Sequence, residues 1–130
     1  MAKTKLSAQL AAGWIEAWIR MDIEWLREHL TTDFVHTSPF GLLVGREHYL
    51  ETVEPMARKS VQRLAIKDVI ASDNQAAIWF ENLTPNGAIP SCDWVRIEDG
   101  KIKEIQSFYD SAKVREVLSA DEQSCLDDTC

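Results

Sequence analysis

The sequence predicts a single α+β domain in which three helices precede a meander of antiparallel strands. Apolar residues recur at helical spacing through the first part of the chain, and from Val61 onward the period changes to that of strands. Turn signals at Asp73-Asn74, Asn86-Gly87 and Asp99-Gly100 divide this second part into strands. Strands joined by tight turns are antiparallel. Because amphipathic helices and an amphipathic sheet bury their apolar faces against each other, we expect helices packed on one face of the sheet.

The helical part divides into three helices. The first covers about Thr4–Met21, and Asp22 is a good N-cap for the second. Gly45 opens the third, in which Pro55 predicts a kink or a break near Glu51–Pro55. The apolar stripes of these helices are Leu6, Leu10, Trp14, Trp18 and Met21; Ile23, Leu26 and Leu30; and Tyr49, Leu50, Val53, Met56 and Ala57.

The strand-like runs are Thr31–Ser38, which Pro39 and Gly41 end, and then residues 61–72, 75–84, 88–98 and 101–109. A two-residue hairpin at Asn86-Gly87 places Pro85 opposite Ala88, and with that register Phe80 opposes Asp93, Asn82 opposes Ser91 and Trp79 opposes Trp94. One face then holds Ile78, Phe80, Asn82, Ser91, Asp93, Val95 and Ile97, and the other holds Trp79, Glu81, Cys92, Trp94 and Arg96.

The first of these faces is the more apolar, so we expect it to meet the helices and to carry Asp93 into the core. Burial should raise the pKa of this carboxyl unless a cation pairs with it, and Arg96 lies on the other face. A three-residue loop with a bulge at Asp99-Gly100 would keep Ile105, Ser107 and Tyr109 on the inward face.

Composition and charge exclude several kinds of partner. The chain has 130 residues and a net charge of -7, with an acidic segment at residues 119–130 that we expect to be a flexible tail after a domain of residues 1–118. No cluster of Lys and Arg suits nucleic acid or an anionic membrane. No apolar run approaches the ~18 residues of a membrane helix, and no signal-peptide pattern opens the chain, so we expect a cytoplasmic protein.

Neither cysteines nor histidines form a metal-binding pattern. The three cysteines, Cys92, Cys125 and Cys130, are not spaced like a disulfide framework or a zinc site. His29 and His48 lie on predicted helices without matching ligands. No glycine-rich phosphate loop appears either, and we expect neither a metal nor another cofactor.

Several motifs, in order along residues 10–118, carry a family resemblance. They are Trp14-x3-Trp18-x3-Asp22-x3-Leu26, the segment 33–41 (DFVHTSPFG) followed by Gly45-Arg46-Glu47, and Asp99-Gly100-Lys101-Ile102 with Phe108-Tyr109-Asp110. Together they resemble the SnoaL-like and ketosteroid isomerase-like members of the nuclear transport factor 2-like superfamily. The resemblance implies a cystatin-like α+β fold whose curved, mostly antiparallel sheet encloses a cone-shaped pocket with the helices.

The resemblance also implies a role for Asp93. Asp93-Trp-Val-Arg-Ile is similar to the ketosteroid isomerase strand whose aspartic acid stays protonated and donates a hydrogen bond to the developing oxyanion. Two other positions depart from that family: Ser38 stands where the general base would be, and Trp14 replaces the tyrosine of the oxyanion hole. His36 is two residues before Ser38 on the same strand face, and an unperturbed histidine pKa of about 6.5 suits it to replace the base.

The sequence leaves structural alternatives open for both residues. Asp93 could be a structural residue bonded to Ser91, Trp14 or a backbone group, and His36 could be a satisfied histidine at a strand end. The residues expected to contact a substrate are Trp14, Trp18, Ser38, Phe40, Tyr49, Phe80, Asn82, Ser107 and Tyr109.

Two functions follow from this set. One is a cofactor-free isomerase, cyclase or lyase in which His36 abstracts a proton from an apolar, carbonyl-bearing molecule and neutral Asp93 stabilises the enolate oxygen. The other is a module of the same fold that binds a small apolar molecule, or acts as a dimeric adaptor, without chemistry. We also expect a homodimer through the convex sheet face at Trp79, Trp94 and Phe108, unless the tail covers these residues.

Overall fold

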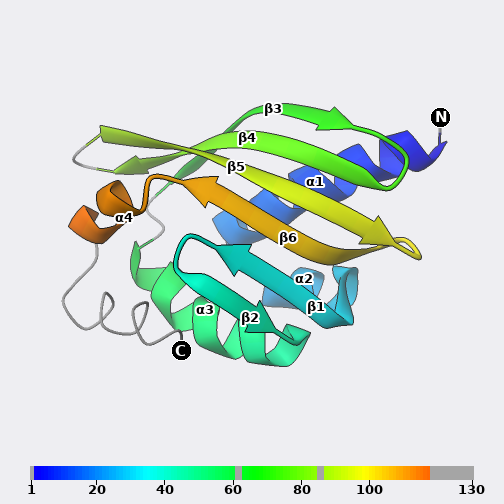
Figure 1. The fold of residues 1–130 in the computed structure, drawn as a ribbon, viewed down its shortest axis with the longest axis horizontal. Helices are drawn as coiled ribbons and strands as arrows, with labels where there is room; N and C mark the ends of the chain where they lie inside the picture. The colour runs from blue at the N-terminus through cyan, green and yellow to red at the C-terminus, as the bar shows by residue number, and fades with distance from the viewer. Residues whose placement is uncertain (1, 61–62, 85–86, 118–130) are drawn as a thin grey trace.

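A six-stranded sheet with helices packed on one face forms the protein (Figure 1). The computed structural model describes residues 2–60, 63–84 and 87–117. Along the chain the elements are α1 (Ala2–Arg20), α2 (Ile23–His29), β1 (Leu30–Ser38), β2 (Gly41–Val44), α3 (Arg46–Ser60), β3 (Leu64–Ala71), β4 (Gln75–Thr84), β5 (Gly87–Glu98), β6 (Lys101–Tyr109) and α4 (Ser111–Val117). This confirms the predicted α+β class, while the predicted tail at 119–130 lies outside the described residues.

The strand order is β2-β1-β6-β5-β4-β3, and every pairing is antiparallel except that of β1 with β6. β1 and β6 are far apart in the sequence, and their parallel pairing joins the helical first part of the chain to the meander. Figure 1 shows α1 behind the strands of the meander and α3 beside β1 and β2. The pairing of β1 with β6 therefore brings His36 to the same sheet as Asp93.

Local signals set the helix ends and the packing between α1 and α2. The Asp22 carboxylate accepts a hydrogen bond from the backbone N–H of Trp25 at 3.1 Å, which confirms Asp22 as the N-cap of α2. Gly13 permits a close approach of α2, because a Cβ at that position would lie 2.4 Å from the Trp25 ring. Gly13 and the Asp22 cap thereby allow α2 to pack closely against α1.

The predicted register of the β4–β5 hairpin is wrong by two residues. Thr84 pairs with Gly87, so the connection lies at 85–86, outside the described residues, rather than at Asn86-Gly87. The facing pairs are therefore Ile78 with Asp93, Phe80 with Ser91, Asn82 with Ile89, Trp79 with Cys92, and Ala77 with Trp94. A shift of two residues keeps every side chain on its face. Asp93 accordingly still lies on the helix-covered face, as predicted.

The turn between β5 and β6 also differs from the prediction. Glu98 pairs with Lys101, so the loop has two residues, with Asp99 at φ 51° and Gly100 at φ 77°. Positive φ at both central residues suits the right-handed twist of a two-residue hairpin, which explains the shorter loop. The bulge expected at this turn lies before it instead, where the register shifts between Arg96 and Ile97. Ser107 consequently pairs with Asp93 on the inward face.

Three smaller expectations need correction. Of the kink or break expected near Pro55, the break does not occur, because α3 continues through this residue. The short strand β2 and the helix α4 were not predicted, because each offers too few residues for a periodic pattern. The first helix covers 2–20 rather than 4–21, β1 begins at Leu30, and β3 covers 64–71 rather than 61–72.

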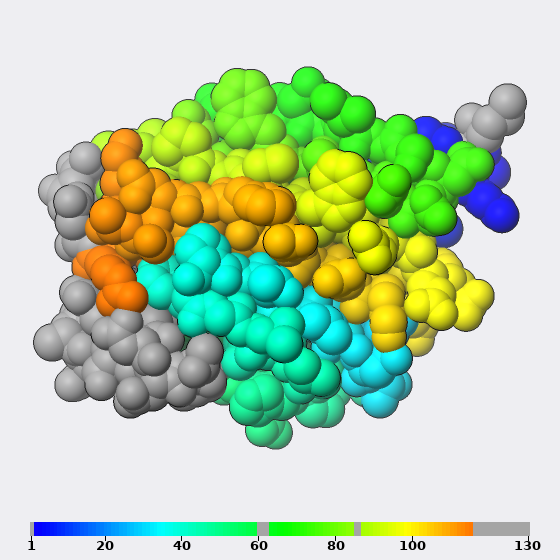
Figure 2. All heavy atoms as spheres, viewed as in Figure 1, coloured from blue at the N-terminus to red at the C-terminus, as the bar shows by residue number. Residues whose placement is uncertain are grey.

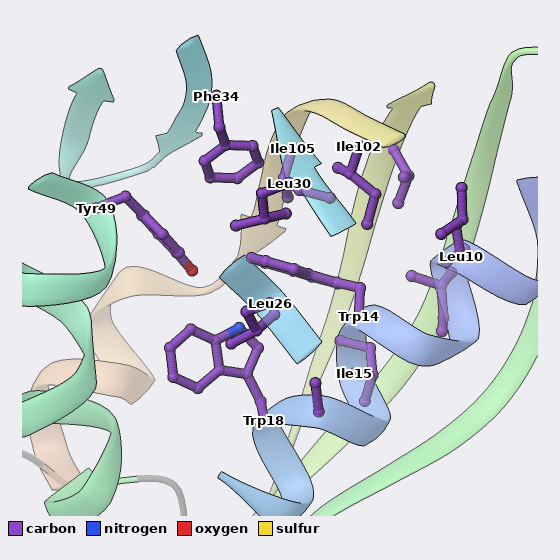
Figure 3. Packing of buried hydrophobic residues seen from close by; sticks show 14 of the residues in the cluster. Leu10, Trp14, Ile15, Trp18, Leu26, Leu30, Phe34, Tyr49, Ile102 and Ile105 are labelled. Carbon is purple, nitrogen blue, oxygen red and sulfur yellow. The ribbon is translucent and has the colours of Figure 1, made fainter. Parts of the chain in front are cut away.

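The core lies between the helices and the inward sheet face. In Figure 3, Trp14 and Trp18 from α1 and Tyr49 from α3 point toward one another, with Leu30 and Phe34 from β1 and Ile102 and Ile105 from β6 beside them. Trp14 and Tyr49 are each 2% exposed. No described helix is both long enough and apolar enough to span a membrane.

No helix among the described residues covers the opposite face of the sheet (Figure 2). Among the described residues, eight large hydrophobic side chains are exposed, and six of them lie on this helix-free face by strand pairing. These six are Leu42, Val44, Ile70, Trp79, Trp94 and Phe108. The expected apolar patch around the two tryptophans therefore extends from β2 to β3.

Candidate functional site

A cavity of about 240 Å³ lies between α1, α3 and the inward face of the sheet. Apolar side chains make up most of its wall, and a few polar groups from β1, β4, β5 and β6 interrupt them. Every residue predicted from the sequence to contact a substrate lines the cavity, as do Asp93 and His36. Whether these residues act on a ligand stays a prediction, but the structure does bring all of them together.

Asp93 is the most deeply buried charged residue of the cavity wall. It is 3% exposed, and its Oδ2 accepts a hydrogen bond from Nε1 of Trp14 at 2.8 Å. Its Oδ1 is buried and has no hydrogen-bond partner among the described residues. Burial raises the pKa of this carboxyl to about 6, against the lowering effects of the Trp14 indole and the nearby Ser107 hydroxyl. The predicted rise in pKa is thus confirmed, and Arg96 pairs instead with Glu104 on the other face.

His36 reaches the same part of the cavity from β1. Its Nε2 lies 3.0 Å from Oγ of Ser107, so the two share a hydrogen bond in which either the imidazole or the hydroxyl donates. Ser107 in turn pairs with Asp93 across β5 and β6. Burial lowers the pKa of His36 to about 4, and the Trp14 and Tyr49 rings lie against it at centroid distances of 6.3 and 5.0 Å. Ser107 therefore stands between the carboxyl and the imidazole.

Aromatic rings form the walls around this polar group. Trp14 meets Trp18 edge to face at 6.1 Å, and Tyr49 lies 5.9 Å from Trp14. Burial raises the pKa of Tyr49 well above its usual value, with a further contribution from the charge of Asp93. Tyr49 is consequently a neutral group. Phe40 and Tyr109, 5.9 Å apart, form another part of the wall near the end of β6.

Two more polar groups line the cavity away from Asp93. The Ser38 hydroxyl accepts a hydrogen bond from the backbone N–H of Phe40 at 3.2 Å. Asn82 presents a buried Oδ1 that, like Oδ1 of Asp93, has no hydrogen-bond partner among the described residues. Of these two groups, only Asn82 has a buried side-chain atom without a partner.

Part of the cavity wall was not predicted from the sequence. It comes from α1, β2, α3, β3, β5 and α4, and it comprises Ile15, Gly41, Leu42, Leu43, Thr52, Val53, Met56, Ala57, Leu64, Ile89, Ser91 and Val114. Tyr49 of the α3 stripe was expected to contact a substrate, whereas Val53, Met56 and Ala57 were assigned to the stripe alone. A core stripe and a cavity wall have the same spacing, so the sequence could not separate them. For β2, the sequence offered only the short segment 40–44 between Pro39 and Gly45, in which Gly41 is followed by three apolar residues.

No group of three or more His, Cys, Asp and Glu side chains in the described part of the chain could hold a metal ion. The polar groups of the cavity are instead one carboxyl, one neutral imidazole, hydroxyls and one amide. Such a set can bind the polar group of an otherwise apolar molecule and can exchange a proton with it.

The protein therefore belongs to the α+β class in which helices pack on one face of a mostly antiparallel sheet and a cavity lies between the helices and the sheet. The chain belongs to the SnoaL-like family, because the model of the SnoaL-like domain matches residues 11–105. A comparison with curated proteins finds no match.

Solved structures with the same fold come from several bacteria. An NTF2-like protein of unknown function from Burkholderia pseudomallei K96243 has a TM-score of 0.74 and 19% identity, over 88% of this chain and 98% of that one. A candidate ketosteroid isomerase from Kribbella flavida DSM 17836 has a TM-score of 0.72 and 15% identity, over 82% and 79%. A candidate SnoaL-like polyketide cyclase from Jannaschia sp. CCS1 has a TM-score of 0.67 and 13% identity, over 88% and 94%. At these identities the likeness shows the fold alone.

Proposed function

We propose that the cavity binds a small, mostly apolar, carbonyl-bearing molecule and that Asp93 moves a proton on it, as in an isomerase or a cyclase. The observation that carries this proposal is Oδ1 of Asp93, a buried carboxyl oxygen to which no described residue donates a hydrogen bond, in a cavity whose wall is otherwise mostly apolar. An unpartnered buried acceptor is costly to the empty protein, and a ligand that meets it relieves the cost. The candidate isomerase and cyclase among the structural neighbours are consistent with such chemistry.

The pKa values favour a different division of roles from the one expected from the sequence. A general base works best when its pKa lies near the working pH. Asp93, with a pKa of about 6, is mostly ionised at pH 7 and can accept a proton, whereas His36, with a pKa of about 4, is a weaker base. We therefore assign the proton abstraction to Asp93, and we assign His36 to the hydrogen bond that orients Ser107.

The reaction can be written with atoms and electrons in balance. Oδ1 of Asp93 takes a proton from the carbon next to the carbonyl, and the electron pair of that C–H bond forms the double bond of an enolate. The Ser107 hydroxyl, oriented by His36, donates a hydrogen bond to the enolate oxygen. Protonated Asp93 then returns the proton to another carbon of the conjugated system, which completes an isomerisation and restores the carboxylate.

Deuterium exchange tests this proposal without knowledge of the natural substrate. Cyclic ketones and enones are incubated with the protein in D₂O, and NMR follows the incorporation of deuterium next to the carbonyl. We expect the catalysed rate to rise with pH through about pH 6 and then to level off, because the ionised carboxylate is the base. Asp93→Asn keeps an oxygen that can accept the Trp14 hydrogen bond, and it should lower the rate by roughly 10²–10⁴.

Glu51→Gln, which removes an exposed carboxylate on α3 outside the cavity wall, is the matched control and should leave the rate unchanged. Exchange that persists in folded Asp93→Asn would contradict the assignment of the base. Binding of the ketones without any exchange would support the alternative, a binding module in which Trp14 holds Asp93 as a structural and ligand-orienting group.

A further inference from the structure

Asn82 and Asp93 lie at different depths along the inward face of the sheet. Asp93 pairs with Ile78 of β4, and Asn82 follows Ile78 by four residues on the same strand face. Four residues of strand separate the two levels by about 13 Å. Both residues line the cavity. The cavity thus has one polar side chain toward the middle of the sheet and another close to the end of β4.

Nothing on the sheet satisfies the side-chain oxygen of Asn82. The residues paired with Asn82 are Leu64 on β3 and Ile89 on β5, and neither side chain has a hydrogen-bond donor. Across the cavity, α3 contributes the apolar side chains of Val53 and Ala57. Within the described part of the chain, Oδ1 of Asn82 is consequently buried without a partner, as is Oδ1 of Asp93. An acceptor left in this condition selects for a ligand that brings a donor.

We propose that the cavity selects elongated apolar molecules that carry a hydrogen-bond donor, a hydroxyl or an N–H group, at the end opposite the group that meets Asp93. This inference rests on the proposed function, because it requires that the cavity take up a small molecule. Asn82 would be the specificity-determining residue. A molecule without the distal donor would leave the amide oxygen unsatisfied and would bind less tightly.

Three rigid two-ring phenols form a matched set of probes. 4-Hydroxybiphenyl carries one hydroxyl, 4,4′-dihydroxybiphenyl adds a donor at the far end, and 4-hydroxy-4′-methoxybiphenyl places there an oxygen that only accepts. Calorimetric titration gives the dissociation constants for the wild-type protein and for Asn82→Leu, a replacement of similar size that removes the amide. Because Asn82→Leu also removes an orphaned buried acceptor, we expect it to raise the melting temperature of the empty protein.

For the wild type we expect the diol to bind roughly 5- to 10-fold more tightly than the monohydroxyl probe, as one satisfied hydrogen bond allows. In Asn82→Leu the two dissociation constants should become equal to within about twofold, through weaker binding of the diol. Equal affinities in the wild type, or a preference that survives in Asn82→Leu, would overturn the inference. If the methoxy probe binds the wild type as tightly as the diol does, the ligand does not donate a hydrogen bond to Asn82, and the inference is overturned. If no probe binds to the wild type while the ketones and enones still exchange deuterium, this inference fails alone. If the ketones and enones neither bind nor exchange either, the proposed function fails with it.

Discussion

Asp93 and His36 are buried on either side of Ser107, and burial shifts their pKa values in opposite directions. The native pKa of Asp93 is raised to about 6, so Asp93 favours the native state at low pH and loses this contribution as pH rises through 6. The native pKa of His36 is lowered to about 4, so His36 favours the native state above pH 6.5 and loses this contribution as pH falls through 4. Each contribution amounts to about 3 kcal/mol.

Between pH 4 and pH 6.5, rising pH removes the stabilisation from Asp93 and adds the stabilisation from His36, so the free energy of unfolding of the wild type should change little. Single substitutions should reveal each contribution separately. In Asp93→Asn, His36 is the remaining shifted group of this pair. The free energy of unfolding of this variant should exceed that of the wild type by about 3 kcal/mol at pH 7, and the difference should disappear as pH falls to 4. In His36→Gln, Asp93 is the remaining shifted group. As pH falls from 7 to 4, this variant should become more stable relative to the wild type, because it has no His36 contribution to lose. Urea unfolding followed by tryptophan fluorescence at a series of pH values measures both differences.

If the free energy of unfolding of the wild type varies with pH in parallel with that of both variants, the pKa of neither Asp93 nor His36 is shifted. Destabilisation by Asp93→Asn at pH 7, with the fold unchanged, would instead indicate that Asp93 is ionised and paired with a cation.

The sequence was sufficient to place Asp93 but not to assign its role. Strand alternation alone put its side chain on the inward face, and burial implied a raised pKa. The lowered pKa of His36 could not be predicted, because it depends on the burial of its ring against Trp14 and Tyr49, which come from two other elements, α1 and α3. The unpartnered oxygen of Asn82 is likewise a property of its neighbours Leu64 and Ile89.

At the scale of elements, the existence and order of the main helices and strands followed from periodicity and turn signals. The register of the β4–β5 hairpin did not, because an Asn-Gly pair marks a turn but does not decide which residue starts the next strand. Gly87, at φ 117°, pairs with Thr84 in the ladder instead of occupying the turn. The resulting shift of two residues moved cross-strand neighbours but preserved the faces. The inward placement of Asp93, Ser91 and Asn82 therefore survived the error.

The pairing of β1 with β6 is the element-scale feature that completes the site. It is a parallel pairing between segments separated by residues 39–100, and no turn signal sets its register. His36 could be assigned to a face of its own strand from the sequence, but its distance from Ser107 depends on this pairing. Long-range pairings of this kind are the part of a fold that local patterns specify least.

At the scale of the whole molecule, the helix-free face defined by Leu42, Val44, Ile70, Trp79, Trp94 and Phe108 has no partner within the described chain. Trp79 and Phe108 are 50% and 52% exposed. The same face carries charges of both signs, in the ion pairs of Lys67 with Glu81 and of Arg96 with Glu104. We propose that a second copy of the chain covers it, because a face with balanced charges around apolar residues can be complementary to itself across a twofold axis.

Light scattering of the purified protein at micromolar concentration should give the mass of a homodimer. Trp79→Glu places a charge in the middle of the apolar face and should give the monomer mass. Ile19→Glu, which alters a similarly exposed apolar residue on α1, is the matched control and should stay dimeric. A monomeric wild type would remove the proposal. A dimer that persists in Trp79→Glu must use another surface.

The central claim is that a small apolar molecule binds in the cavity, and the five tryptophans of the chain allow a direct test. Trp14 and Trp18 line the cavity, whereas Trp79 and Trp94 lie on the opposite face of the sheet. The protein is labelled with 5-fluorotryptophan, its ¹⁹F resonances are assigned by single Trp→Phe substitutions, and 4-hydroxybiphenyl is titrated. We predict that the Trp14 and Trp18 resonances shift to saturation while those of Trp79 and Trp94 do not move. Shifts confined to Trp79 and Trp94, or no shift at any tryptophan, would contradict the claim.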